Sequence, residues 1–113
     1  MIHCVKGTPG WEVYGETAKA LGEVEAKAID KLVFGMDVTD PATAAVLPES
    51  ADEIELVGLV SNICVVSNAV VLQSKYPEAT ITVDAGCTAS FDKDLHEKVL
   101  DILAGFQVKV TGR

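Results

Sequence analysis

The sequence predicts an α/β fold organised around a parallel sheet. In the second half of the chain, short apolar segments typical of strands alternate with segments that have helical periodicity. The links between them are short, and the order β-α-β-α-β favours parallel strands, because each helix returns the chain to the same edge of the sheet. The chain has 113 residues, so we expect one domain at most, spanning residues 1–113.

The segment around Cys64 gives the clearest local pattern. Residues 52–60 first alternate and then become fully apolar, as expected of a buried strand. Ser61 or Asn62 is expected to cap the helix that follows, at about 63–74. This helix is apolar on nearly all sides, so it should be largely buried, and Cys64 falls in its first turn.

Three further elements complete the alternating half of the chain. Residues 79–86 have the composition of a short buried strand, and residues 107–112 alternate as an edge strand does. Between them, residues 90–106 place apolar side chains at helical spacing, with Ser90 or Asp92 as the expected cap. The two strands and the helix extend the parallel sheet.

The first half of the chain is less regular. Residues 3–15 are rich in glycine and contain a proline, which indicates turns. An apolar strand is expected around 27–33, and a short helix is expected after Pro41 and before Pro48.

Charge and composition exclude several classes of function. The formal net charge is −8, which repels phosphate backbones, so no nucleic-acid partner is expected. No apolar run approaches the roughly 18 residues of a membrane span, and the N-terminal MIHCVKGTPG lacks the apolar core of a signal peptide. Cys4, Cys64 and Cys87 are widely spaced and fit free thiols in a reducing compartment. We therefore expect a cytoplasmic protein with no membrane partner.

Two interpretations of Cys64 follow from its surroundings. Free cysteine is among the most buried residue types, so composition alone favours an inert thiol that fills space. A thiol in the first turn of a helix, however, feels the positive end of the helix dipole, which favours the reactive thiolate. The expected position is also the carboxyl end of a parallel strand, where ligands bind in such sheets.

Four segments of the chain carry a family resemblance. They are HCVKGTPG (3–10), AIDKLVFG (28–35), ELVGLVSNICVVSNAV (55–70) and VDAGCTASFD (83–92). Together they resemble the nicotinamidase and isochorismatase-like cysteine hydrolases, and the nicotinamidase branch most closely. The resemblance implies a mostly parallel sheet with helices on both faces. It also implies hydrolysis of an amide through a Cys-Asp-Lys triad, with a metal ion beside the substrate.

The resemblance assigns roles to individual residues. Cys64 matches the nucleophile, and Lys31 matches the lysine of the triad. Leu59 and Val60 match a pair joined by a cis peptide, and the backbone N–H groups of Val60 and Cys64 match the oxyanion hole. His3 matches one ligand of a divalent metal, Zn²⁺ in the intact family member. Cys4 and Cys87 have no catalytic match; Cys4 is expected to pack beside His3, and Cys87 to pack after the strand at 79–86.

Two parts of the family pattern are missing from this chain. The D-x-Q motif, whose Asp is the base of the triad, does not occur, and no D-x-H motif on an upstream strand completes the metal site. The chain therefore resembles the C-terminal portion of the family domain, without its N-terminal strands. We expect low turnover by this chain alone. Three outcomes are open for the gap left in the sheet. The strand near Lys31 shifts to pair with residues 54–60, a second copy or a complementing N-terminal segment fills the gap, or the chain is a poorly folded truncation.

Three functions fit the sequence. The first is a nicotinamidase-like amidohydrolase, which would convert nicotinamide and water to nicotinate and ammonia in NAD salvage. The second is a relative that acts on isochorismate or another small substrate, although HCVKGTPG favours the nicotinamidase branch because it carries the metal-ligand histidine. The third is a non-catalytic remnant or partner subunit, which the missing motifs favour.

Overall fold

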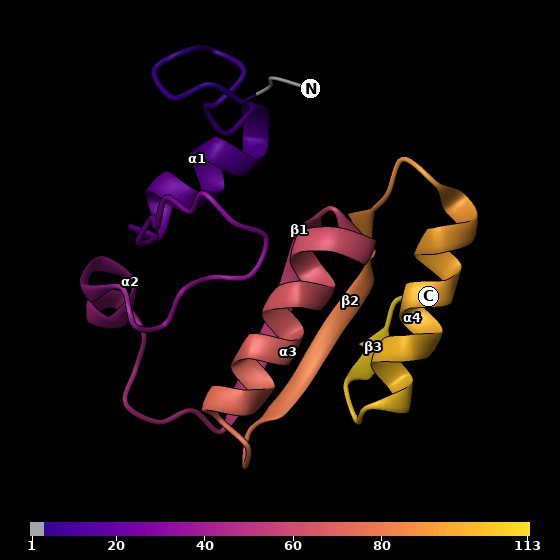
Figure 1. The fold of residues 1–113 in the computed structure, drawn as a ribbon. Coiled ribbons are helices and arrows are strands. Elements are labelled where there is room, and N and C mark those ends of the chain that lie inside the picture. Colours follow the sequence, from indigo (N-terminus) through magenta and orange to yellow (C-terminus); the bar gives the residue numbers. More distant parts are fainter. Residues whose placement is uncertain (1–3) are drawn as a thin grey trace.

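The computed structural model describes residues 4–113 and shows an α/β arrangement (Figure 1). Two short helices come first along the chain, α1 (Gly15–Glu23) and α2 (Pro41–Val46). The alternating part follows, with the strands β1 (Glu53–Leu59), β2 (Thr80–Ala89) and β3 (Lys109–Thr111) and the helices α3 (Val66–Lys75) and α4 (Lys93–Gly105) between them. A π-helical turn, Ser61–Val65, joins β1 to α3.

The three strands form one parallel sheet in the order β1-β2-β3. In the register of this sheet, Leu56 lies opposite Val83, and Val83 lies opposite Val110. The register shifts between Leu56 and Gly58, where β2 contributes extra residues. The prediction of a parallel α/β sheet is confirmed, since β1 pairs with β2 and β2 pairs with β3 in parallel.

The hydrophobic core lies between this sheet and the two long helices. Its largest fully buried apolar side chains are Val83 on β2 and Leu100 and Leu103 on α4. The helices α3 and α4 contact each other, and the Gln73 side chain of α3 donates a hydrogen bond to the Phe106 carbonyl after α4. Right-handed crossovers that run in one direction across a sheet place both helices on the same face.

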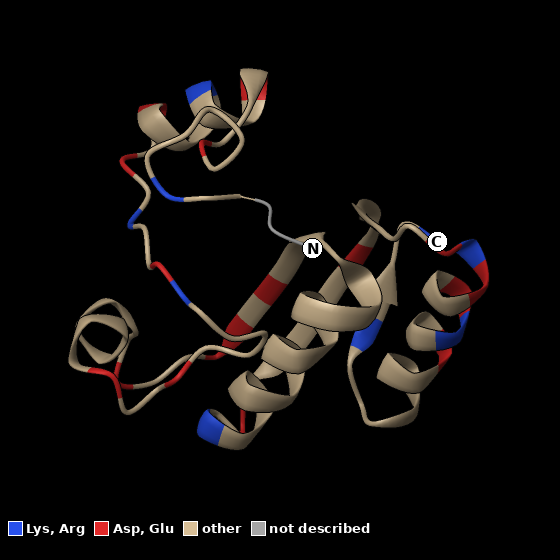
Figure 2. Ribbon diagram, turned by 45° about the horizontal axis from the view of Figure 1, so that its top comes forward, with Lys and Arg blue, Asp and Glu red and all other residues tan. Residues whose placement is uncertain are grey.

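The other face of β1 is exposed, although the resemblance implied helices on both faces. Glu53, Glu55, Val57 and Leu59 point away from the core and are exposed, alternating with half-buried residues that face the helices. The acidic pair appears as red bands on β1 in Figure 2. Within residues 4–113, α3 and α4 therefore cover one face of the sheet, and α1 and α2 stand to one side of it (Figure 1).

The expected helices are present, but one cap differs from the prediction. The Asp92 side chain accepts from the N–H groups of Asp94 and Leu95 and so caps α4, as expected. Neither Ser61 nor Asn62 caps the helix after β1, because both side chains are hydrogen-bonded to other parts of the fold. None of the helices within residues 4–113 is long and apolar enough to cross a membrane.

The strand expected around 27–33 does not form. These residues have no strand assignment, and most are exposed. An extended segment becomes a strand only when a neighbouring backbone accepts its hydrogen bonds, and the strand partner of β1 within the described residues is β2. The predicted shift of this segment onto β1 is therefore wrong. The chain instead passes alongside α3, where residues 34–36 contact the helix.

Candidate active site

Cys64 lies in the turn between β1 and α3. It belongs to the π-helical turn rather than to α3 itself, and its side chain is half-buried. The turn is closed by the carbonyl of Val60, which accepts hydrogen bonds from Ile63 and Val65 at 3.0 and 3.1 Å. The thiol is therefore partly accessible and sits beside the first N–H groups of a helix.

Lys31 reaches this thiol from a distant part of the sequence. Its Nζ lies 3.5 Å from Cys64 Sγ and donates a second hydrogen bond, of 3.0 Å, to the Val33 carbonyl. Within residues 4–113 these two atoms are its hydrogen-bond partners. An ammonium group at this distance stabilises a thiolate electrostatically, and nucleophilic cysteines are activated in this way.

The backbone features implied by the resemblance fall on the same turn. The Leu59–Val60 peptide is cis, at the position where the resemblance places a cis bond. Val60 immediately precedes the π-helical turn, and Cys64 lies within it. Their N–H groups remain the predicted oxyanion hole, a role that needs donors aimed at the oxygen of a tetrahedral intermediate.

Two hydrogen bonds hold the Cys64 turn against α4 and the residues just before it. The sequence predicted neither of them. The fully buried Ser61 hydroxyl shares a hydrogen bond of 2.8 Å with Nδ1 of His96, which is half-buried. The hydroxyl of Ser90 donates to the Asn62 side chain at 2.5 Å. The sequence alone places His96 on the charged side of the last predicted helix and suggests a solvated residue, which the hydrogen bond to Ser61 contradicts. Local sequence patterns carry no signal for such tertiary pairs.

The metal ligands implied by the resemblance do not come together in the described part of the chain. His3 lies outside the described residues. Within residues 4–113, no group of three His, Cys, Asp or Glu side chains is placed to hold a metal ion. A closed zinc site needs four ligands and a catalytic one needs three, and residues 4–113 by themselves assemble neither set.

A second requirement of the triad is a carboxylate near the thiol. A cavity of about 280 Å³ beside Lys31 is lined in part by Asp30, Asp37 and Asp40. Asp30 pairs with Lys6 at 2.8 Å, and Asp40 caps α2. Hydrogen bonds from the Thr39 hydroxyl and backbone lower the pKa of Asp37. These carboxylates have other partners, and none of them forms a hydrogen bond with Lys31 or Cys64.

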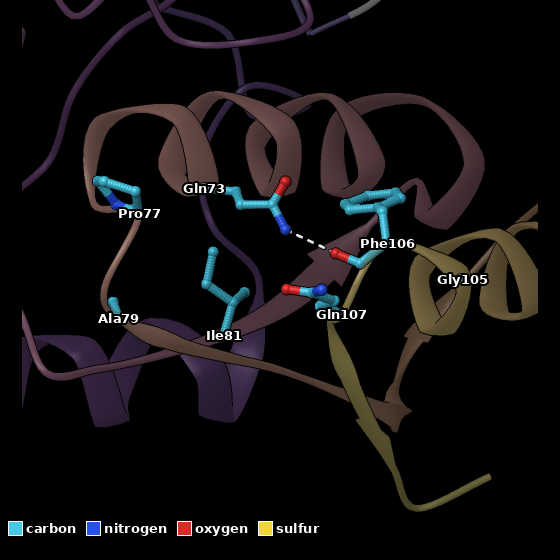
Figure 3. A pocket seen from close by; sticks show the side chains of 7 residues that line it. All are labelled: Gln73, Pro77, Ala79, Ile81, Gly105, Phe106 and Gln107. Atoms are coloured by element: carbon cyan, nitrogen blue, oxygen red, sulfur yellow. Dashed lines mark hydrogen bonds between the residues drawn. The ribbon is translucent and has the colours of Figure 1, made fainter.

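A cavity of about 460 Å³ lies at the opposite end of α3, near its last turn. Figure 3 shows the Gln73 side chain above it, donating to the Phe106 carbonyl at 2.6 Å. The side chains around this cavity are amides and apolar groups, and none of them titrates near neutral pH or acts as a nucleophile. The candidate active site is therefore the Cys64–Lys31 pair.

The other two cysteines differ from Cys64 in their surroundings. Cys4 and Cys87 are both exposed, so the expectation of packing is wrong for Cys87, and the expected packing of Cys4 beside His3 involves a residue outside the described part of the chain. The Cys87 thiol donates to the Asp84 carboxylate at 3.5 Å. This hydrogen bond and the negative charge of Asp84 raise the pKa of Cys87, so its thiol keeps its proton to higher pH.

Replacing Asp84 with asparagine is expected to make Cys87 more reactive. The amide removes the negative charge that raises the pKa of Cys87, while its oxygen can still accept the Gly86 N–H. More of the thiol is then ionised at mildly alkaline pH, and alkylation by iodoacetamide should be several-fold faster. Mass spectrometry of the Cys87 peptide across a pH series measures this. Cys4 serves as the internal control, and an unchanged pH profile for Cys87 would contradict the assignment.

The chain is similar in sequence and structure to known proteins. A family model described as the isochorismatase domain matches residues 1–113. A nicotinamidase from Bacillus subtilis is 22% identical, with a TM-score of 0.76 over 98% of this chain and 63% of its own. A nicotinamidase from Staphylococcus aureus is 25% identical, with a TM-score of 0.77 over 99% of this chain and 71% of its own. No curated protein matches the chain.

These similarities bear on fold more than on substrate. A pyrazinamidase/nicotinamidase from Streptococcus mutans is also similar, at 22% identity and a TM-score of 0.71 over 93% of this chain and 60% of its own. This chain therefore spans less than two thirds of the length of the Bacillus and Streptococcus proteins. At such identities the shared property is the fold, which the three neighbours have in common.

Proposed function

Because the chain belongs to the isochorismatase domain family, we propose that it is a cysteine-dependent amidohydrolase that resembles the nicotinamidases. The observation that carries this proposal is the contact of 3.5 Å between Lys31 Nζ and Cys64 Sγ, in the turn that follows β1. The proposed substrate is a small aromatic carboxamide such as nicotinamide. The proposed role is NAD salvage in the cytoplasm, where thiols stay reduced.

The proposed reaction uses the thiolate of Cys64 as the nucleophile. Its sulfur forms a bond to the carboxamide carbon, and the carbonyl electron pair moves onto oxygen, where the N–H groups of Val60 and Cys64 stabilise it. Collapse of this intermediate breaks the C–N bond and releases ammonia, once nitrogen has gained a proton. The product is a thioester, and water then hydrolyses it to the acid and restores the thiol.

Proton transfer limits this reaction in the 113-residue chain. The leaving nitrogen needs an acid, and no carboxylate within residues 4–113 forms a hydrogen bond with Lys31 or Cys64. We therefore propose that the chain alone turns over slowly. A second copy, or a complementing segment that supplies an Asp, would restore the acid and complete the sheet beside β1.

A panel of substrates tests this function. The purified chain is incubated with nicotinamide, benzamide and isochorismate, and substrate consumption, ammonia released from the amides and intact protein mass are measured together. We expect a nicotinoyl thioester to form slowly on Cys64, with one ammonia released for each thioester formed. Processing of isochorismate without any acyl adduct would favour the second candidate function, that of a relative that acts on isochorismate or another small substrate. Absence of any adduct and of any product would support the non-catalytic remnant and overturn the proposal.

A further inference from the structure

Asn68 lies one helical turn after Cys64 and contacts the segment that carries Lys31. Its side-chain oxygen accepts the N–H of Met36 at 2.7 Å, and its side-chain nitrogen donates to the Phe34 carbonyl at 3.2 Å. One half-buried amide thus binds a donor and an acceptor of the same short backbone segment. The partners fix the orientation of the amide, because a backbone N–H needs an acceptor and a carbonyl needs a donor.

The same amide is also tied to the nucleophile's own turn. The nitrogen of Asn68 donates a hydrogen bond of 2.9 Å to the Cys64 carbonyl. Asn68 therefore links the backbone at Cys64 to the backbone at Phe34, although these residues are far apart in sequence. Hydrogen bonds that connect into such a network hold their members in one geometry.

Close packing supports this link at the intervening residue. A Cβ built on Gly35 would lie 3.2 Å from a methyl carbon of Val71 and 3.5 Å from the Ser67 carbonyl oxygen. The backbone at Gly35 therefore lies against α3 with little free space. Asn68 binds the residues on both sides of this contact, so the segment is docked at one register along the helix.

This docking matters because no strand holds Lys31. The segment around 27–33 is not part of the sheet, and Lys31 is exposed. The distance along the chain from Lys31 to the docked residues 34–36 is only a few residues. The contact with α3 thus limits where the ammonium can be.

We propose that Asn68 is a positioning residue that places the Lys31 ammonium beside the Cys64 thiolate. This inference rests on the proposed function, in which the ammonium stabilises the nucleophile. Asn68 does not touch the reacting atoms. It acts by docking the backbone of residues 34–36 on α3, and the expected consequence of its loss is a mobile Lys31 and a less reactive thiol.

The test measures the reactivity of Cys64 in a Cys4→Ser, Cys87→Ser background, so that only one thiol remains. The variants are Asn68→Ala, Lys31→Met and the double variant. We expect Asn68→Ala to slow alkylation by iodoacetamide at neutral pH by about tenfold, as misplacement of a supporting group does. Lys31→Met should slow it similarly, and the double variant should be no slower than Lys31→Met alone. The ultraviolet absorbance of the thiolate should fall in parallel.

A matched control separates positioning from general loss of stability. Gln73 is also an amide on α3, and it donates a hydrogen bond of 2.6 Å to the Phe106 carbonyl, away from the active site. Gln73→Ala should leave the alkylation rate unchanged. Amide hydrogen exchange at Met36 should become faster in Asn68→Ala but not in Lys31→Met, because only the first removes the acceptor of that N–H.

Several outcomes would overturn the inference. A wild-type alkylation rate in Asn68→Ala would overturn it. Additive effects in the double variant would also overturn it, because they would mean that Asn68 affects Cys64 independently of Lys31. An unchanged rate in Lys31→Met would do so as well. If Asn68→Ala fails to fold, Asn68→Asp replaces it. This variant keeps an acceptor for Met36 but turns an oxygen toward the Phe34 and Cys64 carbonyls.

This experiment is independent of the substrate panel. Alkylation, thiolate absorbance and hydrogen exchange need no amide substrate, so failure of every amide in the panel leaves this test intact. Conversely, an acyl adduct on Cys64 together with normal alkylation in Asn68→Ala would leave the proposed function standing and remove only the role of Asn68.

Discussion

Replacing Cys64 with serine is expected to abolish acyl-adduct formation and ammonia release. The hydroxyl of serine is a much weaker nucleophile than a thiolate, and the Lys31 ammonium at 3.5 Å favours an anion that serine does not form at neutral pH. Removal of a nucleophile lowers rates by roughly 10³-fold or more in well-studied hydrolases. Intact-mass analysis after incubation with nicotinamide measures the adduct directly.

The other two cysteines provide matched controls for this substitution. Cys4→Ser and Cys87→Ser remove exposed thiols that take no part in the proposed reaction. Each should leave adduct formation unchanged. In the wild-type chain, Cys64 should also react faster with iodoacetamide than a free peptide thiol does. Equal adduct yields in Cys64→Ser and wild type, or a Cys64 that reacts no faster than the peptide, would contradict its role as an activated nucleophile.

The alternating half of the fold could be predicted from the sequence because its hydrophobic signals are strong and local. Val99 and Leu103 recur on one side of the predicted helix, and both are buried in α4. The strand predicted at 52–60 is β1, Glu53–Leu59, with its boundaries shifted by a single residue at each end. Such segments bury one face or one stripe, so the pattern of the residues determines the element.

The first half could not be predicted in the same way, because its structure depends on partners that a local pattern does not contain. The segment at 27–33 has the composition of a strand, yet within residues 4–113 no strand pairs with it. Helix α1 buries none of its residues and has no side-chain cap, so it gives little signal either at its start or along its length.

The candidate site shows the same division. The position of Cys64 after a strand followed from local sequence, and the resemblance pointed to Lys31 as its neighbour. The sequence did not identify the residues that support them. Ser61 and Asn62 are residue types that commonly cap helices, and Asn68 looks like an ordinary residue of the predicted helix. Their actual partners are His96, Ser90 and the backbone near Phe34, all distant in sequence.

Replacing Leu100 with alanine is expected to destabilise the fold strongly. Leu100 is fully buried on α4, in the core cluster that includes Val83 of β2 and Leu103. Truncation removes apolar contacts and leaves a cavity that the neighbouring side chains fill only in part. The expected loss is about 2–5 kcal/mol in the free energy of unfolding. Urea titrations followed by circular dichroism measure the shift of the midpoint.

Ile102 on the same helix is the matched control, because its side chain is 57% exposed. Ile102→Ala should change the free energy of unfolding by no more than about 0.5 kcal/mol, since exposed positions contribute little packing. The contrast tests where the stability of this short chain lies. The Cys64 turn contacts α4 through Ser61 and His96, so loss of the α4 core should also slow alkylation of Cys64 before the midpoint is reached. Equal midpoints for the two variants would show that α4 is not packed on the sheet as described.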